Sequence, residues 1–246
     1  FAIIGSRRLS TDMILKETHG TTEDRTELEE TPDEDDASSF VGSGSPVLLG
    51  DHTDGVVEHA QQYARLAELP PTLIEDLEWA ACWHDVGKVD PRFQAMLHAG
   101  DEIEALLAMK SGRFLGKSGI PANDRAAQNR ARRLAGVPKG FRHEALSVIL
   151  LRQPEQAELL AQVNDPDLAL LLIGTHHGVG RPTHPVCVDE DPPEIDIEWR
   201  GRPWRASAES RKRDQLFRLE NDWPGLFARV SGRYGIWKLA WCEALF

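Results

Sequence analysis

The sequence predicts an all-α protein. From Asp51 onward, apolar residues recur every three or four positions, which is the period of an amphipathic helix. Strand-like alternation is clear in one stretch, 194–207, where Ile195, Ile197 and Trp199 alternate with polar residues before an Arg-Gly turn. The 246 residues, 41% hydrophobic and 28% charged, are enough for one large domain and a tail. We therefore expect a helical bundle that carries a small exposed β-hairpin.

Residues 1–45 differ in composition from the rest of the chain. They hold 11 acidic and 4 basic side chains, so they carry −7 of the formal net charge of −12. Nine of the acids lie between Glu23 and Asp36, and a Gly- and Ser-rich stretch follows. We predict a flexible acidic linker over 1–45 and a folded domain over 46–246. The first residues, FAIIGSRR, include neither an initiator Met nor a secretory signal, which favours a piece of a longer protein.

Two helices are predicted at the start of the domain. The first spans about 53–69 and ends at a pair of prolines. The second opens with Thr72 and Glu75 in the spacing of a capping box and ends near Gly87. Its apolar stripe continues to His84, so we expect that histidine at the buried C-terminal end of the helix.

Two more helices follow. One begins with Asp90 as the cap and a proline at the first helical position, and it runs through Leu97. The Gly-, Asn- and Arg-rich stretch 110–142 is expected to form loop and a short helix. The next helix starts near Arg142 and therefore carries His143 in its first turn.

The remaining elements include the hairpin and three helices. The first of these helices runs from the cap Asp165 to Gly178 and ends on two histidines. After the hairpin, helices over about 206–220 and 224–246 finish the chain.

Histidines gather at the ends of the predicted helices. Five of the nine lie there, beside apolar stripes: His52, His84, His143, His176 and His177. A single histidine in such a place is usually a core imidazole, but burying five without partners costs several kcal/mol each. A divalent metal satisfies them together. The other four are expected at the surface or in packing roles: His19, His59, His98 and His184.

The neighbouring residues His84 and Asp85 point to a site with two metal ions. Side chains of successive helical residues point about 100° apart, so the two can reach different ions, or Asp85 can bridge them. Imidazole and carboxylate ligands without thiolate suit Mn, Fe, Ni, Co or Zn in a hydrolytic site, and Mg is a further candidate metal. Two divalent ions can activate water and hold the oxygens of a phosphodiester. The predicted reaction class is therefore metal-assisted phosphoester hydrolysis.

The three cysteines lie far apart and include no C-x-x-C pair, which excludes a zinc ribbon and a disulfide framework. They are typical of a reducing compartment, so a cytoplasmic location is predicted. No apolar run approaches the ~20 residues of a membrane span, and no membrane partner is expected.

Five motifs carry a family resemblance: HTDGVVEHA, AACWHDVGKVDPRFQ, FRHEALSVILL, GTHHGVGRP and YGIWKLAWCEAL. Over about 48–246 the chain resembles the HD-superfamily nuclease domain of the CRISPR-associated helicase-nuclease of type I systems. A His-Asp pair alone is a weak signal, but HDxGKxxxxFQ followed by RHE and HHGxGRP is specific to that group. The resemblance implies an HD-superfamily helical bundle with a dimetal site. The acidic tail fits the subtypes in which this domain is C-terminal to the helicase.

The resemblance implies six metal ligands: His52, His84, Asp85, His143, His176 and His177. It also implies catalytic roles for His84, Asp85 and Lys88, with the aspartate bridging the ions. The Lys88 ammonium would contact the scissile phosphate. A cation that only stabilises a helix C-terminus is the alternative for Lys88.

The sequence departs from the family pattern at its end. In the family a final aspartate, which completes the first metal site, follows the helix that here ends at Phe246. We therefore expect the second metal position to be better formed than the first. Its ligands are Asp85, His143, His176 and His177.

The implied function is a metal-dependent deoxyribonuclease that hydrolyses single-stranded DNA in CRISPR interference, an antiviral defence. The implied partners are a fused or associated ATP-dependent helicase and an RNA-guided surveillance complex. The net charge of −12 argues against a protein that captures nucleic acid by itself, although the chain after residue 45 carries only −5. We expect weak intrinsic affinity for DNA, with the strand delivered by the partners.

Basic residues cluster at 125–142 and 200–213. Four arginines are expected to contact DNA: Arg142, Arg181, Arg202 and Arg205. Trp199 and Trp204 are available to stack on bases. Solvated basic faces and buried tryptophans are the alternative interpretation.

Three other functions stay open. The main one is an HD phosphohydrolase that acts on nucleotide monophosphates, deoxynucleoside triphosphates or cyclic dinucleotides. The second is a non-catalytic domain that docks a helicase on an RNA-guided complex. An HD-fold oxygenase with mixed-valent iron is the third, but the sequence offers no pocket for its substrate.

Overall fold

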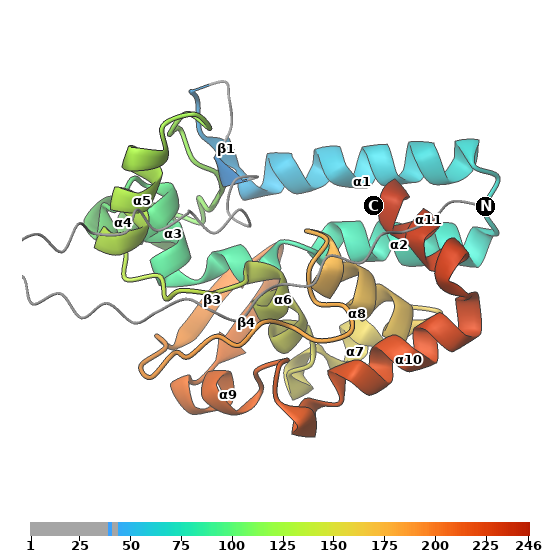
Figure 1. Cartoon of the computed structure of the whole chain (residues 1–246). Helices are drawn as coiled ribbons and strands as arrows, with labels where there is room; N and C mark the ends of the chain where they lie inside the picture. The colour runs from blue at the N-terminus through green and yellow to red at the C-terminus, as the bar shows by residue number, and fades with distance from the viewer. Residues whose placement is uncertain (1–38, 41–43) are drawn as a thin grey trace, which may run out of the picture. The chain divides into compact units, whose positions relative to one another are not determined.

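The computed structural model describes residues 39–40 and 44–246, which belong to one compact unit, Pro32–Phe246 (Figure 1). Most of the predicted acidic linker, 1–45, lies outside the described residues. Two of its residues pack in the domain, because Ser39 and Phe40 are buried and Phe40 bridges to Ser118. The packed domain therefore includes residues that the composition assigned to the linker.

The described residues are mostly helical, which confirms the predicted all-α class. The α-helices are α1 (Leu49–Leu66), α2 (Pro71–Trp83), α3 (Pro91–Leu97), α4 (Glu102–Lys110), α5 (Arg125–Leu134), α6 (His143–Leu151), α7 (Ala157–Leu160), α8 (Pro166–Thr175), α9 (Ala208–Arg213), α10 (Trp223–Tyr234) and α11 (Ile236–Leu245). Single 3₁₀ turns are η2 (Val86–Val89), η3 (Pro154–Gln156) and η4 (Leu219–Asn221). Two antiparallel pairs join β1 (Val47–Leu48) to β2 (Leu115–Lys117) and β3 (Ile195–Trp199) to β4 (Arg202–Ala206).

Helices α6 and α8 form the centre of the core. Every residue of α6 is buried, and so is every residue of α8 from Leu168 onward. Helices that are apolar on all sides need neighbours on all sides. Helix α8 packs against α2, α6, α10 and α11, while α1 lies along α2 on the outside (Figure 1). The ends of α2, α6 and α8 are thereby buried inside the domain.

The predicted caps explain where two helices begin, and fail for a third. The Asp90 side chain accepts from Phe93 N at the start of α3, and Asp165 does the same for Leu168 N at the start of α8. The expected capping box of α2 is wrong, because the helix begins at Pro71 without a side-chain cap. Proline has the φ angle of a helix and no N–H to satisfy, so it suits the first helical position.

The hairpin β3–β4 forms as predicted, but it is not simply an exposed element. Ile195, Trp199, Trp204 and Ala206 are buried, and Trp204 donates from Nε1 to the Trp199 carbonyl over 3.2 Å. Alternate residues of a strand face opposite sides, so one face of the hairpin completes the core. The two tryptophans are therefore not available for base stacking.

Other departures concern helix lengths. Helix α4 was not predicted, and three of its apolar residues are exposed: Ile103, Leu106 and Leu107. The helix expected over 206–220 is much shorter, as α9. The last predicted helix is broken at Gly235, whose φ of +75° ends α10 before α11 begins.

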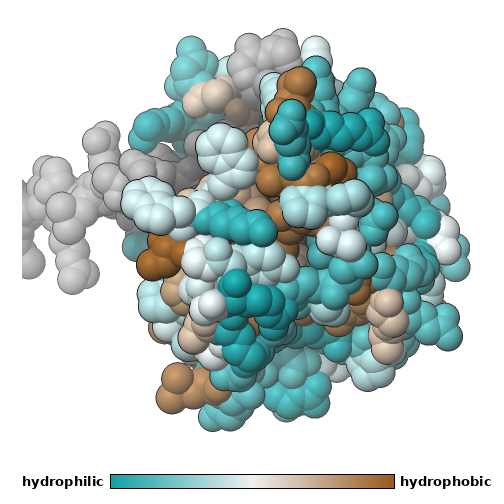
Figure 2. Space-filling view, turned by 90° about the vertical axis from the view of Figure 1, so that its right-hand side faces the viewer, coloured by the Kyte–Doolittle hydropathy of each residue, from teal (hydrophilic) through white to brown (hydrophobic). Residues whose placement is uncertain are grey.

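Apolar side chains are exposed at one end of the domain. Figure 2 looks onto the end where α11 and the last turns of α1 lie, and brown residues stand among teal ones there. Exposed apolar residues of these helices include Leu66, Ile236, Trp237 and Trp241.

Candidate metal centre

Four helices bring the six predicted ligands together. His52 lies in the first turn of α1, His84 and Asp85 follow the end of α2, and His143 is the first residue of α6. The remaining two, His176 and His177, follow the end of α8. Their ligand atoms form two groups that share Asp85. One group is Asp85, His143, His176 and His177, and the other is His52, His84 and Asp85; within each, the atoms lie within 4.8 Å of one another.

The carboxylate of Asp85 lies between the two groups. Its Oδ1 is 3.1 Å from His143 Nε2 and 3.6 Å from His176 Nε2. Its Oδ2 is 3.1 Å from His52 Nε2 and 3.3 Å from His84 Nε2. Each oxygen therefore serves one group, which is the arrangement that a bridging ligand requires.

His177 completes the four-residue group beside His143 and His176. Its Nε2 lies 3.1 Å from His143 Nε2, and its ring centroid lies 4.1 Å from that of His176. Three imidazoles thus meet at one face of the carboxylate.

Helix ends fix the orientation of two of the rings. His84 donates from Nδ1 to the Ala81 carbonyl, and His176 donates from Nδ1 to the Ile173 carbonyl, each over 2.7 Å. These carbonyls belong to the last turns of α2 and α8, where acceptors have no helical partner. With Nδ1 protonated, each Nε2 carries a lone pair toward Asp85. The C-terminal ends of the helices therefore select the tautomer that binds metal.

Burial keeps the imidazoles neutral and nearby cations keep the carboxylate ionised. Desolvation lowers the pKa of His143 to about 4, and it also lowers the pKa of His84 and of His177. Burial by itself would raise the pKa of Asp85, but interactions with the surrounding imidazoles and with the Lys88 ammonium, 2.8 Å away, hold it well below its usual range. Neutral imidazole and ionised carboxylate are the forms that bind a metal ion.

Gly87 of the HDxGK motif allows η2 to approach α6. A Cβ atom at this position would lie 2.0 Å from the His143 carbonyl oxygen. The Gly87 N–H donates to Ser147 Oγ over 2.8 Å, and that hydroxyl donates to the same carbonyl over 3.0 Å. The glycine therefore sets the distance between Asp85 and His143.

Lys88 is buried against the carboxylate. Its ammonium lies 2.8 Å from Asp85 Oδ2 and donates to the Gly116 carbonyl over 3.1 Å, and the residue is 2% exposed. The structure thus places Lys88 as a partner of Asp85 within the protein.

Gln94 of the same motif ties η2 to β2. Its Nε2 donates to the carbonyls of Lys88 and Leu115, and its Oε1 accepts from Leu115 N, over 2.8 to 2.9 Å. The side chain is fully buried. Gln94, the last residue of the HDxGKxxxxFQ motif, therefore has a structural role: it joins η2 to β2.

A pocket of about 160 Å³ opens over the ligands. It is lined by His52, Val56, His84, Asp85, Lys88, Lys117, His176, His177 and Phe246. Three of these were not predicted: Val56, Lys117 and Phe246. The Phe246 ring meets His84 and His176 edge-on, with centroids 5.7 and 6.0 Å apart. No signal in the sequence could have placed Lys117 there, because it reaches the pocket from a two-stranded sheet that the periodicity did not reveal.

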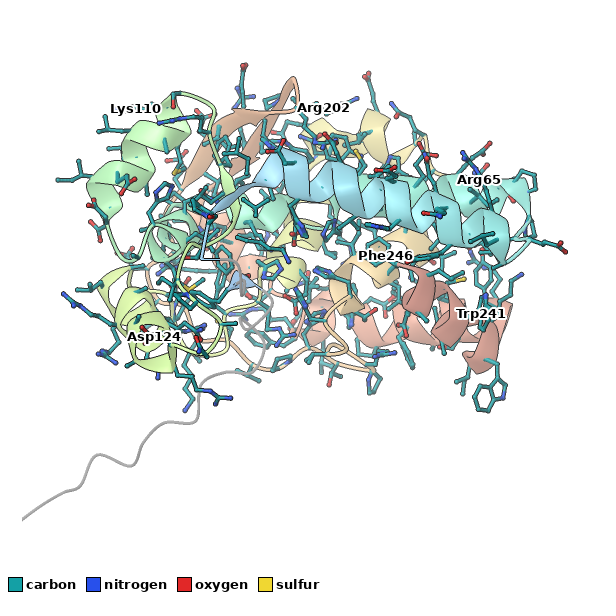
Figure 3. All side chains as sticks on the ribbon, turned by 90° about the horizontal axis from the view of Figure 1, so that it is seen from above. Arg65, Lys110, Asp124, Arg202, Trp241 and Phe246 are labelled. Atoms are coloured by element: carbon teal, nitrogen blue, oxygen red, sulfur yellow. The ribbon has the colours of Figure 1, made fainter. Side chains whose placement is uncertain are left out.

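The four arginines predicted to contact DNA differ in their surroundings. Arg142 is buried and paired with Glu144, which contradicts a role on the surface. Arg181 is exposed and paired with Glu243, while Arg205 is exposed and lies 2.9 Å from Asp196. Arg202 is half-buried on the hairpin. In Figure 3 it lies on the other side of α1 from Phe246 of the pocket.

Three of the described histidines lie outside the cluster, namely His59, His98 and His184, while His19 lies outside the described residues. His59 is exposed and stacks on Tyr63. The expectation that His184 is a surface residue is wrong, because it is buried with its ring 4.8 Å from that of Trp223.

The residues present fit a divalent metal. Both oxygens of Asp85 and Nε2 of His176 are buried without a well-aligned hydrogen bond from any described residue, although Lys88 forms an ion pair with the carboxylate. In the same place His143 Nε2 faces His177 Nε2. Buried acceptor atoms such as the Asp85 oxygens and His176 Nε2 are costly without a donor unless a cation binds them.

One comparison decides the family. A family model described as "Cas3, HD domain" matches residues 51–223, a span that includes all six predicted ligands. The chain belongs to the Cas3 HD-domain family. The match confirms the resemblance to the HD domain of type I CRISPR systems, and Cas3 HD domains are CRISPR-associated metal-dependent nuclease domains. The comparisons found no matching curated protein and no matching solved structure.

Among the described helices, none has the length and apolar character that a membrane crossing needs.

Proposed function

We propose that this Cas3 HD domain hydrolyses phosphodiester bonds of single-stranded DNA with two divalent metal ions. The observation that carries the proposal is the position of Asp85, with one oxygen toward each group of ligands. One ion would be held by His52, His84 and Asp85, and the other by Asp85, His143, His176 and His177. When bound, two such ions supply an activated water and neutralise the charge of the phosphodiester.

The protein contributes a prepared set of ligands. The carbonyls of Ala81 and Ile173 hold the rings of His84 and His176 with Nε2 toward the carboxylate. Burial keeps the imidazoles neutral, so no proton has to leave before they bind an ion. Lys88 balances the charge of Asp85 from the side of Gly116.

The strand would approach the pocket through its open side. Arg181 is an exposed cation that pairs with Glu243, whose other oxygen accepts from Thr175 at the end of α8. We propose that Arg181 guides the strand, and that Arg202 and Arg205 contact DNA farther away on the hairpin. Arg142 is not part of this proposal because it is buried.

Partners would supply the substrate in CRISPR interference. The formal charge of the whole chain is −12, so strong capture of DNA from solution is not expected. We propose that an ATP-dependent helicase and an RNA-guided surveillance complex deliver the displaced strand in the cytoplasm.

A nuclease assay on circular single-stranded DNA tests the proposal. With Mn²⁺ or Ni²⁺ the wild-type protein is expected to cut the circle. Asp85→Asn keeps the size of the side chain but removes the charge shared by both groups, so cleavage should fall by at least about a hundredfold. Asp191→Asn, in an exposed loop, is the matched control and should cut like the wild type.

Two results would contradict the proposal. Hydrolysis of deoxynucleoside triphosphates, monophosphates or cyclic dinucleotides without any cleavage of the circle would identify a small-nucleotide phosphohydrolase. Metal binding without cleavage of any of these substrates would identify a docking domain.

A further inference from the structure

Two lysines line the metal pocket, and they differ in burial and in the partners of their ammonium groups. Lys88 comes from η2 and Lys117 from the end of β2. Lys88 is 2% exposed and its ammonium is bound to Asp85 and to the Gly116 carbonyl. That ammonium is already occupied inside the protein, so it is poorly placed to receive a phosphate.

Lys117 is half-buried at the wall of the pocket. In the described part of the chain, its side chain forms neither a hydrogen bond nor an ion pair with a carboxylate. Burial lowers the pKa of Lys117, and the nearby charge of Lys88 lowers it further, while the charge of Asp85 offsets part of this effect. A cation that is partly desolvated and has no directly paired anion is stabilised when an anion binds beside it.

The backbone that carries Lys117 is held firmly beside the ligands. Gln94 fixes Leu115 through two hydrogen bonds, and Lys117 pairs with Val47 in the β1–β2 sheet. At Gly116 a Cβ atom would lie 3.1 Å from the Cβ of His52. The lysine therefore starts from a fixed position next to a ligand, so little order is lost when it binds.

We propose that Lys117 binds a phosphate of the DNA strand in the metal pocket, and that Lys88 serves Asp85 instead. This inference rests on the proposed function, because it assigns a phosphate contact to the nuclease site. A lysine suits this role as a compact point charge with three donors. The substrate class that it selects is a polyanionic strand.

Salt dependence of binding is the direct test. A fluorescent single-stranded oligonucleotide is titrated with the protein in the presence of a chelator, which prevents cleavage, over a range of salt concentrations. Loss of one phosphate contact lowers the slope of log affinity against log salt by about 0.7 for a single strand. Lys117→Gln is expected to show this change and to bind roughly tenfold more weakly at low salt, whereas Lys117→Arg keeps the wild-type slope.

Lys110→Gln is the matched control. Lys110 is exposed at the end of α4 and lies well apart from Phe246 of the pocket (Figure 3). Circular dichroism and the melting temperature verify that each variant is folded. In the presence of Mn²⁺, Lys117→Gln should raise KM for the oligonucleotide and change kcat much less, because the lysine binds the strand and holds no ion.

The outcomes separate this inference from the proposed function. If the wild type binds and cuts the strand while Lys117→Gln matches Lys110→Gln in affinity, slope and KM, the role of Lys117 is refuted and the nuclease function stands. If the wild type neither binds nor cuts single-stranded DNA, both are refuted.

Discussion

His84 and Asp85 follow each other in the chain, yet their side chains reach different parts of the metal centre. His84 turns its Nε2 to Asp85 Oδ2, on the side of His52. The other oxygen, Oδ1, faces His143. At the end of α2, His84 keeps helical backbone angles of φ −56° and ψ −37°, whereas Asp85 departs from them with φ −103° and ψ 10°. A single carboxylate can thereby join ligands from four helices.

The two groups are expected to bind metal with different strength. The group with His143 offers four ligands and the group with His52 offers three, so the first ion should bind to the former. In a Mn²⁺ titration followed by calorimetry, His143→Ala should weaken the tighter site by at least about a hundredfold. His52→Ala should leave the tighter site intact and abolish the weaker one. Loss of the tighter ion in His52→Ala would contradict this order.

At the scale of elements, the site depends on how closely η2 packs on α6. Gly87 makes the contact possible, and Ser147 closes it with two hydrogen bonds. On the other side, Gln94 joins η2 to β2. The signature motif is thus a packing device as well as a source of ligands.

Gly87→Ala should therefore damage both folding and metal binding. The new Cβ would lie 2.0 Å from a backbone oxygen, so η2 and α6 must move apart. We expect a loss of about 3 kcal/mol in the free energy of unfolding, measured by urea denaturation, together with weaker Mn²⁺ binding.

Gly55→Ala provides the control for that experiment. Gly55 lies within α1 and a Cβ there would meet nothing within 4 Å. Alanine in an open helical position should stabilise the protein by up to about 1 kcal/mol. Equal stability of the two variants would show that the contact between η2 and α6 does not matter.

At the scale of the whole molecule, buried imidazoles tie stability to pH. Burial lowers the pKa of His143 and of His184 to about 4 in each case. An imidazole in the unfolded chain titrates near pH 6.5, roughly its ordinary value. As the pH falls from there toward 4, the unfolded state gains protons that the folded state excludes, and the free energy of unfolding decreases.

His184 allows this effect to be measured away from the metal ligands. It packs on Trp223, and neither of its ring nitrogens has a hydrogen-bond partner in the described part of the chain. His184→Phe should reduce the pH dependence of stability by up to about 1.4 kcal/mol per pH unit between pH 6 and 5, in urea unfolding of the metal-free protein. His59→Gln, at an exposed position, is the control. An unchanged pH dependence in His184→Phe would contradict the assignment.

Net charge is a poor guide to the partners of this molecule. The acidic side chains of residues 1–45 account for −7 of the −12, and the described domain buries some of its own cations. Arg142 and Lys88 are paired inside the protein. Which basic residues can meet a strand is therefore decided by burial and not by their number.

The helical class, the caps Asp90 and Asp165, and a motif order specific enough to identify the family can all be predicted from the amino-acid sequence. These features depend on residues close together in the chain, where helical period and capping chemistry act directly. The motifs also predicted six metal ligands, and the structure brings these six side chains together in two groups that share Asp85.

Which of the basic residues reach the pocket and which are buried depends on how the folded chain packs. Lys88 meets the Gly116 carbonyl, Lys117 enters the pocket from β2, and Arg142 pairs with Glu144 inside the core. Local sequence carries no record of burial for a charged residue, since the same lysine is stable in water or beside a carboxylate. The difference arises when segments distant in the chain pack together and remove water from some cations but not from others.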